Sequence, residues 1–219
     1  MIKAIETEYK GRRFRSRLEA RWAVLFDNLG IKWIYEPEGF ILENNIKYLP
    51  DFYLPDLDIW VEVKGVLNEL DEKKIIAFVS TGKEVWLVKN IPESDQDQNI
   101  SEYDFIMYKG EEDYGVGSDY PYLPCVCPLC GKVGVEYSGR GMRVCNGKHL
   151  KFIKKYGYTE LFCLQHQIYI DENGKAVGMK YPNFVDGRLD DKGYSFGSPI
   201  VQNAIKMANS SRYEWGEKG

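Results

Sequence analysis

Residues 48–65 read YLPDFYLPDLDIWVEVKG, and this stretch is the most informative in the chain. Two runs within it, 48–54 and 59–64, are rich in aromatic and branched aliphatic residues, which favour strands. Between them lie Pro55 and Asp56, residues typical of a turn. The stretch therefore predicts two neighbouring strands that pair across a short connection.

Side chains alternate between the two faces of a strand, so the second run has two different faces. The face predicted to point into a core carries Ile59, Val61 and Val63. The opposite face carries Trp60, Glu62 and Lys64. A half-buried strand with a carboxylate and a lysine two residues apart at its end is unusual, and it indicates a polar site there.

The flanking sequence predicts further helices and strands. A helix is expected over 16–29, because Leu18, Trp22, Leu25 and Leu29 recur at helical spacing before Gly30. A second helix is expected over 69–80, ending near Gly82. Further strands are expected over 32–35, 39–42, 84–88 and 104–108. This order of elements predicts an α/β sandwich.

Composition limits the class of protein. The chain has 219 residues, of which 44% are hydrophobic and 28% charged, as in a globular protein. We expect one domain over 1–110, a linker over 110–121, and a second module over 122–219 that ends in a helix over 199–213. The sequence has no apolar run long enough to cross a bilayer, and its first ten residues lack a signal-peptide core. We therefore expect a cytoplasmic protein with no membrane partner.

Charge is unevenly distributed. The net charge is -4, yet 10–21 holds six basic residues against one acid, and 137–159 holds six basic residues and no acid. Local patches of this kind can contact a phosphate backbone, although each taken alone can equally be a solvated face. The candidate nucleic-acid contacts are Arg13, Arg15, Arg17, Arg140, Arg143 and Lys148.

The polar residues of the strand pair suit phosphodiester chemistry. Asp51 can reach the same place as Glu62 if the two strands pair. Mg²⁺ prefers oxygen ligands and is usually held by one or two carboxylates together with water and substrate phosphate. Lys64 would then orient a water molecule or offset phosphate charge as a compact point charge. Asp56 and Asp58 are better interpreted as turn residues, and nothing demands that Glu36 or Glu38 enter the site.

The spacing Pro50-Asp51, ten residues, then Glu62-Val63-Lys64 resembles the PD-(D/E)XK (restriction-endonuclease-like) nuclease superfamily. The resemblance covers about residues 9–90, and the runs 14–22 and 35–40 look like those of small bacteriophage nucleases. It implies an αβββαβ core and a Mg²⁺- or Mn²⁺-dependent endonuclease acting on DNA, in host cytoplasm if phage-encoded. It further implies that Glu19 joins Asp51, Glu62 and Lys64 in the active site, and that the Val63 carbonyl binds metal.

Two of these residues have simpler interpretations. Glu62 and Lys64 can form an exposed salt bridge on a strand face. Glu19 can complete a capping box with Ser16 at the start of the first helix. Glu19 also shares a helical face with apolar residues, which favours a carboxylate that points at a partner over one that faces bulk water.

Four of the five cysteines lie between 125 and 145, which indicates a metal site. Cys127 and Cys130 have the spacing of a zinc knuckle, and Cys145 with His149 is the favoured second pair. Strands over 132–137 and 140–144 would form a hairpin between them, so the segment resembles a zinc ribbon. The alternative ligands are Cys163 with His166, and Cys125.

Two other functions stay open. The chain can be a non-catalytic nucleic-acid-binding protein that keeps the nuclease fold, or a structural virion component that uses the zinc module for assembly. The sequence does not distinguish linear, branched or single-stranded DNA from RNA. It does not decide whether the protein forms a homodimer, as cutting two strands would usually require.

Overall fold

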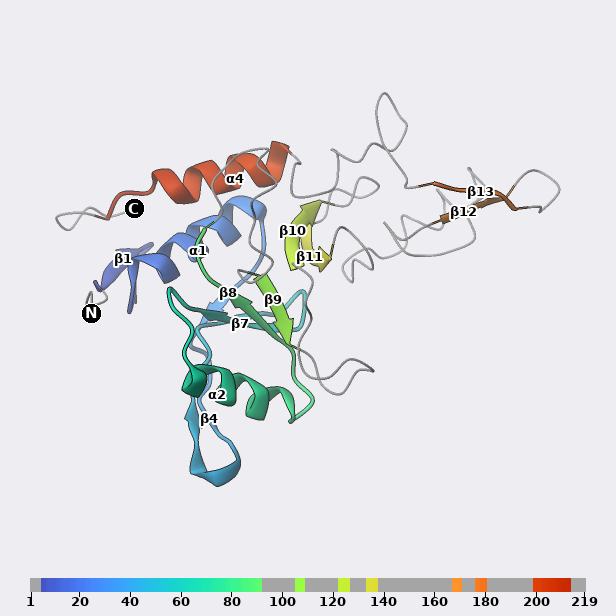
Figure 1. The fold of residues 1–219 in the computed structure, drawn as a ribbon. Coiled ribbons are helices and arrows are strands. Elements are labelled where there is room, and N and C mark those ends of the chain that lie inside the picture. The colour runs from blue at the N-terminus through green and yellow to red at the C-terminus, as the bar shows by residue number, and fades with distance from the viewer. Residues whose placement is uncertain are drawn as a thin grey trace. The chain divides into compact units, whose positions relative to one another are not determined.

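The computed structural model describes residues 5–91, 105–108, 122–126, 133–137, 167–170, 176–180 and 199–213. These residues form a mixed arrangement of helices and sheets (Figure 1). This confirms the α/β class, while the nuclease-type core and the zinc ribbon stay predictions. The chain divides into two compact units, one of residues 1–121 with 203–219 and one of residues 122–202.

A five-stranded sheet forms the centre of the first unit. Its strands, in spatial order, are β3 (Ile34–Tyr35), β6 (Phe52–Leu54), β7 (Ile59–Val63), β8 (Val85–Val88) and β9 (Phe105–Tyr108). Neighbours are antiparallel except β7 and β8, which are parallel. Parallel strands need a crossover connection, and helix α2 (Glu69–Val79) provides it. The strands predicted over 32–35, 59–64, 84–88 and 104–108 are confirmed, with shifts of one or two residues at their ends.

Helix α1 (Arg17–Leu29) covers one face of this sheet. Ser16 caps its first turn by accepting the Glu19 N–H, and Gly30 ends it in the left-handed conformation at φ 67°. Trp22 packs edge-on against Trp86 of β8, with 5.3 Å between ring centroids. The helix predicted over 16–29 is therefore confirmed, and its apolar stripe forms half of the core.

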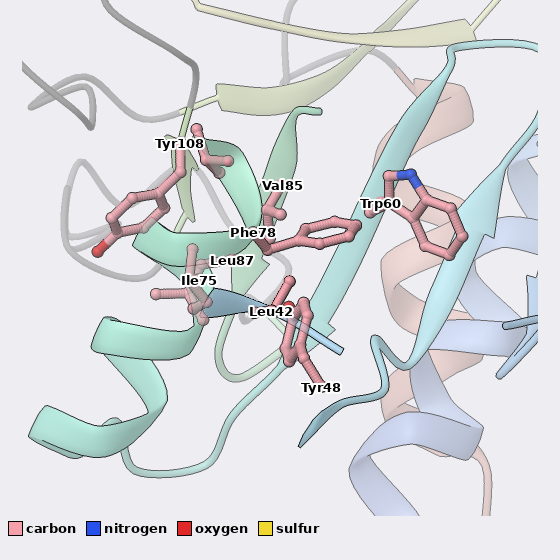
Figure 2. Close-up of a cluster of buried hydrophobic side chains, with 9 residues drawn as sticks. Leu42, Tyr48, Trp60, Ile75, Phe78, Val85, Leu87 and Tyr108 are labelled. Carbon is pink, nitrogen blue, oxygen red and sulfur yellow. The ribbon is translucent and has the colours of Figure 1, made fainter. Parts of the chain in front are cut away.

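Helix α2 covers the other face, where Figure 2 shows Phe78 turned toward Trp60. The Phe78 ring lies 5.6 Å from Trp60 and 5.0 Å from Tyr48, centroid to centroid. The predicted alternation along β7 is correct, since Trp60, Glu62 and Lys64 share the α2 side. The expectation of a half-buried strand is wrong, because every residue of β7 is buried.

The strand expected over 48–54 is interrupted. Its first part, β5 (Lys47–Tyr48), pairs with β4 (Phe40–Ile41), and a 3₁₀ turn, η1 (Glu43–Asn45), joins those two strands. Only the second part, β6, enters the central sheet. Pro50 lies at the break, and proline has no N–H to donate to a ladder. The break directs Asp51 toward the end of β7.

An N-terminal hairpin was not expected from the sequence. Strands β1 (Thr7–Tyr9) and β2 (Arg12–Phe14) pair around Lys10 and Gly11, whose φ values are 49° and 73°. Two positive φ values are the mark of a tight hairpin turn that suits the strand twist. The hairpin ends in the buried Phe14 and leads directly into α1.

The second unit contains two described strand pairs. One joins β10 (Tyr122–Val126) to β11 (Val133–Tyr137), and the other joins β12 (Gln167–Ile170) to β13 (Ala176–Lys180). The strand predicted over 132–137 is confirmed, but its described partner is 122–126. The partner expected for it, 140–144, lies outside the described residues.

The C-terminal helix α4 (Pro199–Ser210) is confirmed as a helix. It was expected with the second module, but its residues from Asn203 onward belong to the first unit. There it lies along α1 (Figure 1) and buries Ala204, Ile205 and Ala208. In the ranges given above, no helix combines the length and apolar composition needed to span a bilayer.

The Phe78 cluster predicts a strong stability effect. Replacing the fully buried Phe78 by alanine removes ring contacts with three aromatic neighbours and leaves a cavity. We expect Phe78→Ala to lower the free energy of unfolding by about 3–5 kcal/mol in urea titrations. The control, Ile76→Ala on the exposed side of the same helix, should change it by less than about 1 kcal/mol. Equal effects of the two variants would contradict the described packing.

Candidate active site

Two buried carboxylates meet where β6 begins and β7 ends. Asp51 and Glu62 are 3% and 4% exposed. Phe52 pairs with Val61, so Asp51 and Glu62 occupy the next opposed positions of the antiparallel register. The Val63 N–H donates to Asp51 Oδ2 at 2.7 Å. The register therefore brings the two carboxylates together, as pairing across the turn requires.

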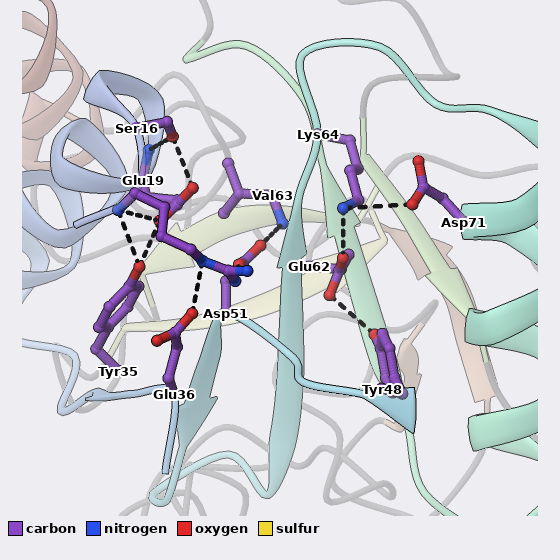
Figure 3. A network of polar contacts seen from close by, with 11 residues as sticks. Ser16, Glu19, Tyr35, Glu36, Tyr48, Asp51, Glu62, Val63, Lys64 and Asp71 are labelled. Carbon is purple, nitrogen blue, oxygen red and sulfur yellow. Dashed lines mark hydrogen bonds and ion pairs between the residues drawn. The ribbon is translucent and has the colours of Figure 1, made fainter. Parts of the chain in front are cut away.

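Both oxygens of Glu62 have protein partners. Lys64 Nζ lies 2.8 Å from Glu62 Oε1, and the Tyr48 hydroxyl donates to Oε2 at 3.0 Å (Figure 3). Lys64 Nζ also lies 3.5 Å from Asp71 Oδ1, on the first turn of α2. A salt bridge between Glu62 and Lys64 is thus present, but Glu62 is buried and only Lys64 is partly exposed, so it is not an exposed strand-face pair.

Glu19 lies at the same end of the sheet, on the first turn of α1, and is 7% exposed. Its Oε1 accepts from the Ser16 hydroxyl at 2.7 Å, and its Oε2 accepts from the Tyr35 hydroxyl at 2.6 Å and the Arg15 N–H at 3.1 Å. The capping interpretation is therefore correct in part, since Ser16 and Glu19 bond reciprocally. The bond to Tyr35 also holds the carboxylate against the sheet.

Arg15 lies between two carboxylates. Its Nη2 is 2.7 Å from Asp51 Oδ1, and its Nε is 2.6 Å from Glu36 Oε1. Glu36 has a φ of 43°, a left-handed conformation that costs a residue other than glycine about 1–2 kcal/mol. Its N–H donates to the Asp51 carbonyl at 2.8 Å, which holds this conformation in place. Backbone strain of this kind is often found at functional sites.

The buried acids perturb one another. Burial raises the pKa of Asp51 well above its ordinary value, and the charges of Glu62 and Glu19 raise it further. The Val63 N–H and Arg15 oppose this shift. Burial also raises the pKa of Glu62, against the effects of Lys64 and Tyr48. Such mutually unfavourable carboxylates are typical of functional sites.

The donor chemistry fits a hard divalent cation. The atoms that could bind a metal here are the carboxylate oxygens of Glu19, Asp51 and Glu62, all buried at this end of the sheet. Mg²⁺ prefers oxygen ligands of this kind. The charges of Glu62 and Glu19 disfavour the ionised form of Asp51, and a nearby cation would offset this repulsion. Among the residues that the structure describes, however, no three acidic, histidine or cysteine side chains are already arranged to hold a metal ion. Binding therefore requires side chains to exchange partners.

Four residues of this network were not predicted from the sequence. They are Tyr35, Glu36, Tyr48 and Asp71. One signal was available for Asp71, because Asn68 caps α2 and the capping pattern places an acid three residues later. No sequence signal identified the other three, which reach the site through strand pairing and the bend at Glu36.

The remaining predicted residues are placed as follows. Arg13 is exposed on β2, and Arg17 begins α1 and is partly buried. Cys125 lies on β10. Outside the described residues are Cys127, Cys130, Arg140, Arg143, Cys145, Lys148, His149, Cys163 and His166.

Comparison with known proteins adds no relative to this description. The sequence matches no protein-family model, and no curated protein matches it. The interpretation of the site therefore depends on its own geometry and chemistry.

The pKa of Asp51 predicts a pH dependence of stability. In the folded state this carboxyl releases its proton at a higher pH than in the unfolded chain, where aspartates ionise at about pH 4. The free energy of unfolding should therefore fall as the pH rises above about 4, until Asp51 ionises and pairs with Arg15. Asp51→Asn cannot titrate, so in metal-free urea titrations it should lose less stability than wild type over this range.

Asp56→Asn is the matched control, because Asp56 is about half exposed in the turn between β6 and β7. Its pH profile should run parallel to that of wild type. If the pH profile of Asp51→Asn also runs parallel to that of wild type, the pKa of Asp51 is not raised by folding.

Proposed function

We propose that this chain is a Mg²⁺- or Mn²⁺-dependent endonuclease that hydrolyses phosphodiester bonds in DNA. The observation that carries the proposal is the placement of Asp51 and Glu62. These two acids are buried opposite each other on adjacent strands, with Lys64 beside them. An arrangement that buries repelling charges is unfavourable for folding alone, so it supports a catalytic role.

Each residue has a role in this reaction. Asp51, Glu62 and the Val63 carbonyl would hold the cation, with Glu19 completing the acidic set. When bound, the cation neutralises charge on the phosphate and makes water a nucleophile near neutral pH. Lys64 offsets phosphate charge or orients the attacking water. Asp71, 3.5 Å from the Lys64 ammonium, keeps that side chain extended toward α2 until substrate arrives.

Substrate contact is assigned to basic residues outside the acidic cluster. Arg13 is exposed on the hairpin that leads into α1, and Arg17 begins that helix. Contacts of this kind position the backbone of DNA and do not read its sequence. Arg140, Arg143 and Lys148 would extend the contact from the second unit. Branched or junction DNA is a candidate substrate, and a homodimer is a candidate form for cutting two strands.

The second unit is proposed to bind a structural Zn²⁺ ion. The strands β10 and β11 flank residues 127–132, which include Cys127 and Cys130. Tetrahedral zinc takes thiolate and imidazole ligands, and Cys145 with His149 would complete the set. A metal would add stability to a segment of this size, which is too short to bury a large core by itself.

A second candidate function also has support. Every carboxylate oxygen of Glu19, Asp51 and Glu62 already accepts a bond or ion pair from the protein. A site closed in this way suits a non-catalytic nucleic-acid-binding protein that keeps the nuclease fold. The two candidates differ in whether a divalent cation produces cleavage.

The test is cleavage of supercoiled plasmid and a synthetic four-way junction with Mg²⁺, Mn²⁺ or EDTA. We expect wild type to cut in the presence of either cation, and Glu62→Gln and Asp51→Asn to cut at least about a hundredfold more slowly. Asp56→Asn, in the exposed turn, should cut as wild type does. The rate of product formation on gels measures the effect, with circular dichroism to show that each variant is folded.

Two results would contradict the nuclease proposal. Cleavage that persists in both carboxylate variants would place the activity elsewhere. Binding of these DNAs without cutting under any metal condition would favour the non-catalytic candidate.

A further inference from the structure

The Arg15 guanidinium occupies a position that a bound cation would need. It lies 2.7 Å from Asp51 Oδ1, one of the two oxygens of that carboxylate. The other oxygen, Oδ2, accepts the Val63 N–H, which belongs to β7 and cannot move independently of the sheet. Arg15 therefore pairs with the Asp51 oxygen whose partner is a side chain and not the backbone of the sheet.

The exposure of the two partners differs strongly. The Asp51 side chain is 4% exposed, whereas that of Arg15 is 56% exposed. The arginine thus lies on the solvent side of Asp51, and Arg15 belongs to no strand of the central sheet. Asp51, by contrast, is fixed between β6 and β7.

Glu36 gives the arginine a second anchor. Its carboxylate lies 2.6 Å from Arg15 Nε and is more exposed than Asp51, at 24% against 4%. The N–H of Glu36 donates to the Asp51 carbonyl, so the two acids stay neighbours (Figure 3). An arginine that gives up Asp51 can therefore keep Glu36 and remain at the edge of the site.

We propose that Arg15 is a positioning residue that neutralises Asp51 in the metal-free protein and is displaced from it by a divalent cation. The inference depends on the proposed function, since it assigns Asp51 to a metal site. A buried carboxylate without a counter-charge is strongly unfavourable, and a guanidinium supplies that charge when no metal does. A cation that binds Oδ1 takes over the same task, so the two compete for one oxygen.

The first test measures metal affinity directly. In isothermal titrations with Mn²⁺, Arg15→Gln should bind about tenfold more tightly than wild type, which corresponds to about 1.4 kcal/mol. The control is Lys32→Gln, which removes an exposed cation paired with Asp56 in the β6–β7 turn and should bind as wild type does. Without metal, Arg15→Gln should melt at a lower temperature than wild type, and saturating Mn²⁺ should raise its melting temperature by more.

The second test follows the arginine itself in the unaltered protein. The ¹⁵N resonance of Arg15 Nε should shift on addition of Mg²⁺. It is assigned by its absence from the Arg15→Gln spectrum. If that variant does not fold, the Arg15→Lys spectrum serves the same purpose. Resonances of arginines away from the site should not move.

The outcomes separate this inference from the proposed function. Two results would show that a cation does not displace Arg15 while leaving the metal site in place. In the first, wild type binds Mn²⁺ and Arg15→Gln binds it equally or more weakly. In the second, Mg²⁺ binds and the Arg15 resonance does not shift. If neither wild type nor any variant binds a divalent cation, both the proposed function and the displacement of Arg15 are wrong.

Discussion

The hydrogen bond from the Val63 amide to Asp51 joins two segments that the chain approaches from different directions. Asp51 follows the break at Pro50, and Val63 ends the central strand. Because this bond uses a backbone donor, it fixes the carboxylate relative to the whole sheet. The network around Glu62, Glu19 and Arg15 is arranged about that fixed point. Any shift in the β6–β7 register would move Asp51 away from Glu62 and separate the acids.

The two faces of the sheet have different relations to this site. On the α1 side, aromatic rings pack around Trp22, whose indole N–H donates to the Lys89 carbonyl. On the α2 side, apolar packing around Phe78 continues directly into the polar pairs of Glu62. Tyr48 belongs to both, since its ring contacts Phe78 and its hydroxyl bonds Glu62. Apolar packing on this side therefore also holds the Tyr48 hydroxyl in place against Glu62.

Local patterns made much of the first unit predictable. Both helices have a cap at the first residue and a regular apolar stripe, and β7 alternates as a strand should. The contacts that complete the site depend on distant pairing and were not predictable in this way. Glu36 reaches Arg15 only because β3 pairs with β6, and Arg15, expected on phosphate, pairs with Asp51 instead. The buried α2 side of β7 was missed because strand alternation says nothing about which element covers a face.

The return of α4 to the first unit has a consequence for the chain's architecture. Residues 122–202 leave the first unit after position 121 and rejoin it at Asn203, so they form an inserted domain with two covalent attachments. Shortening the chain from its C-terminus would remove Ile205 and Ala208 from the core of the first unit before it affected the inserted one. An evolutionary loss or exchange of the insertion would instead leave that core complete. The insertion can thus vary independently, whereas residues 1–121 and 203–219 depend on each other because they share one core.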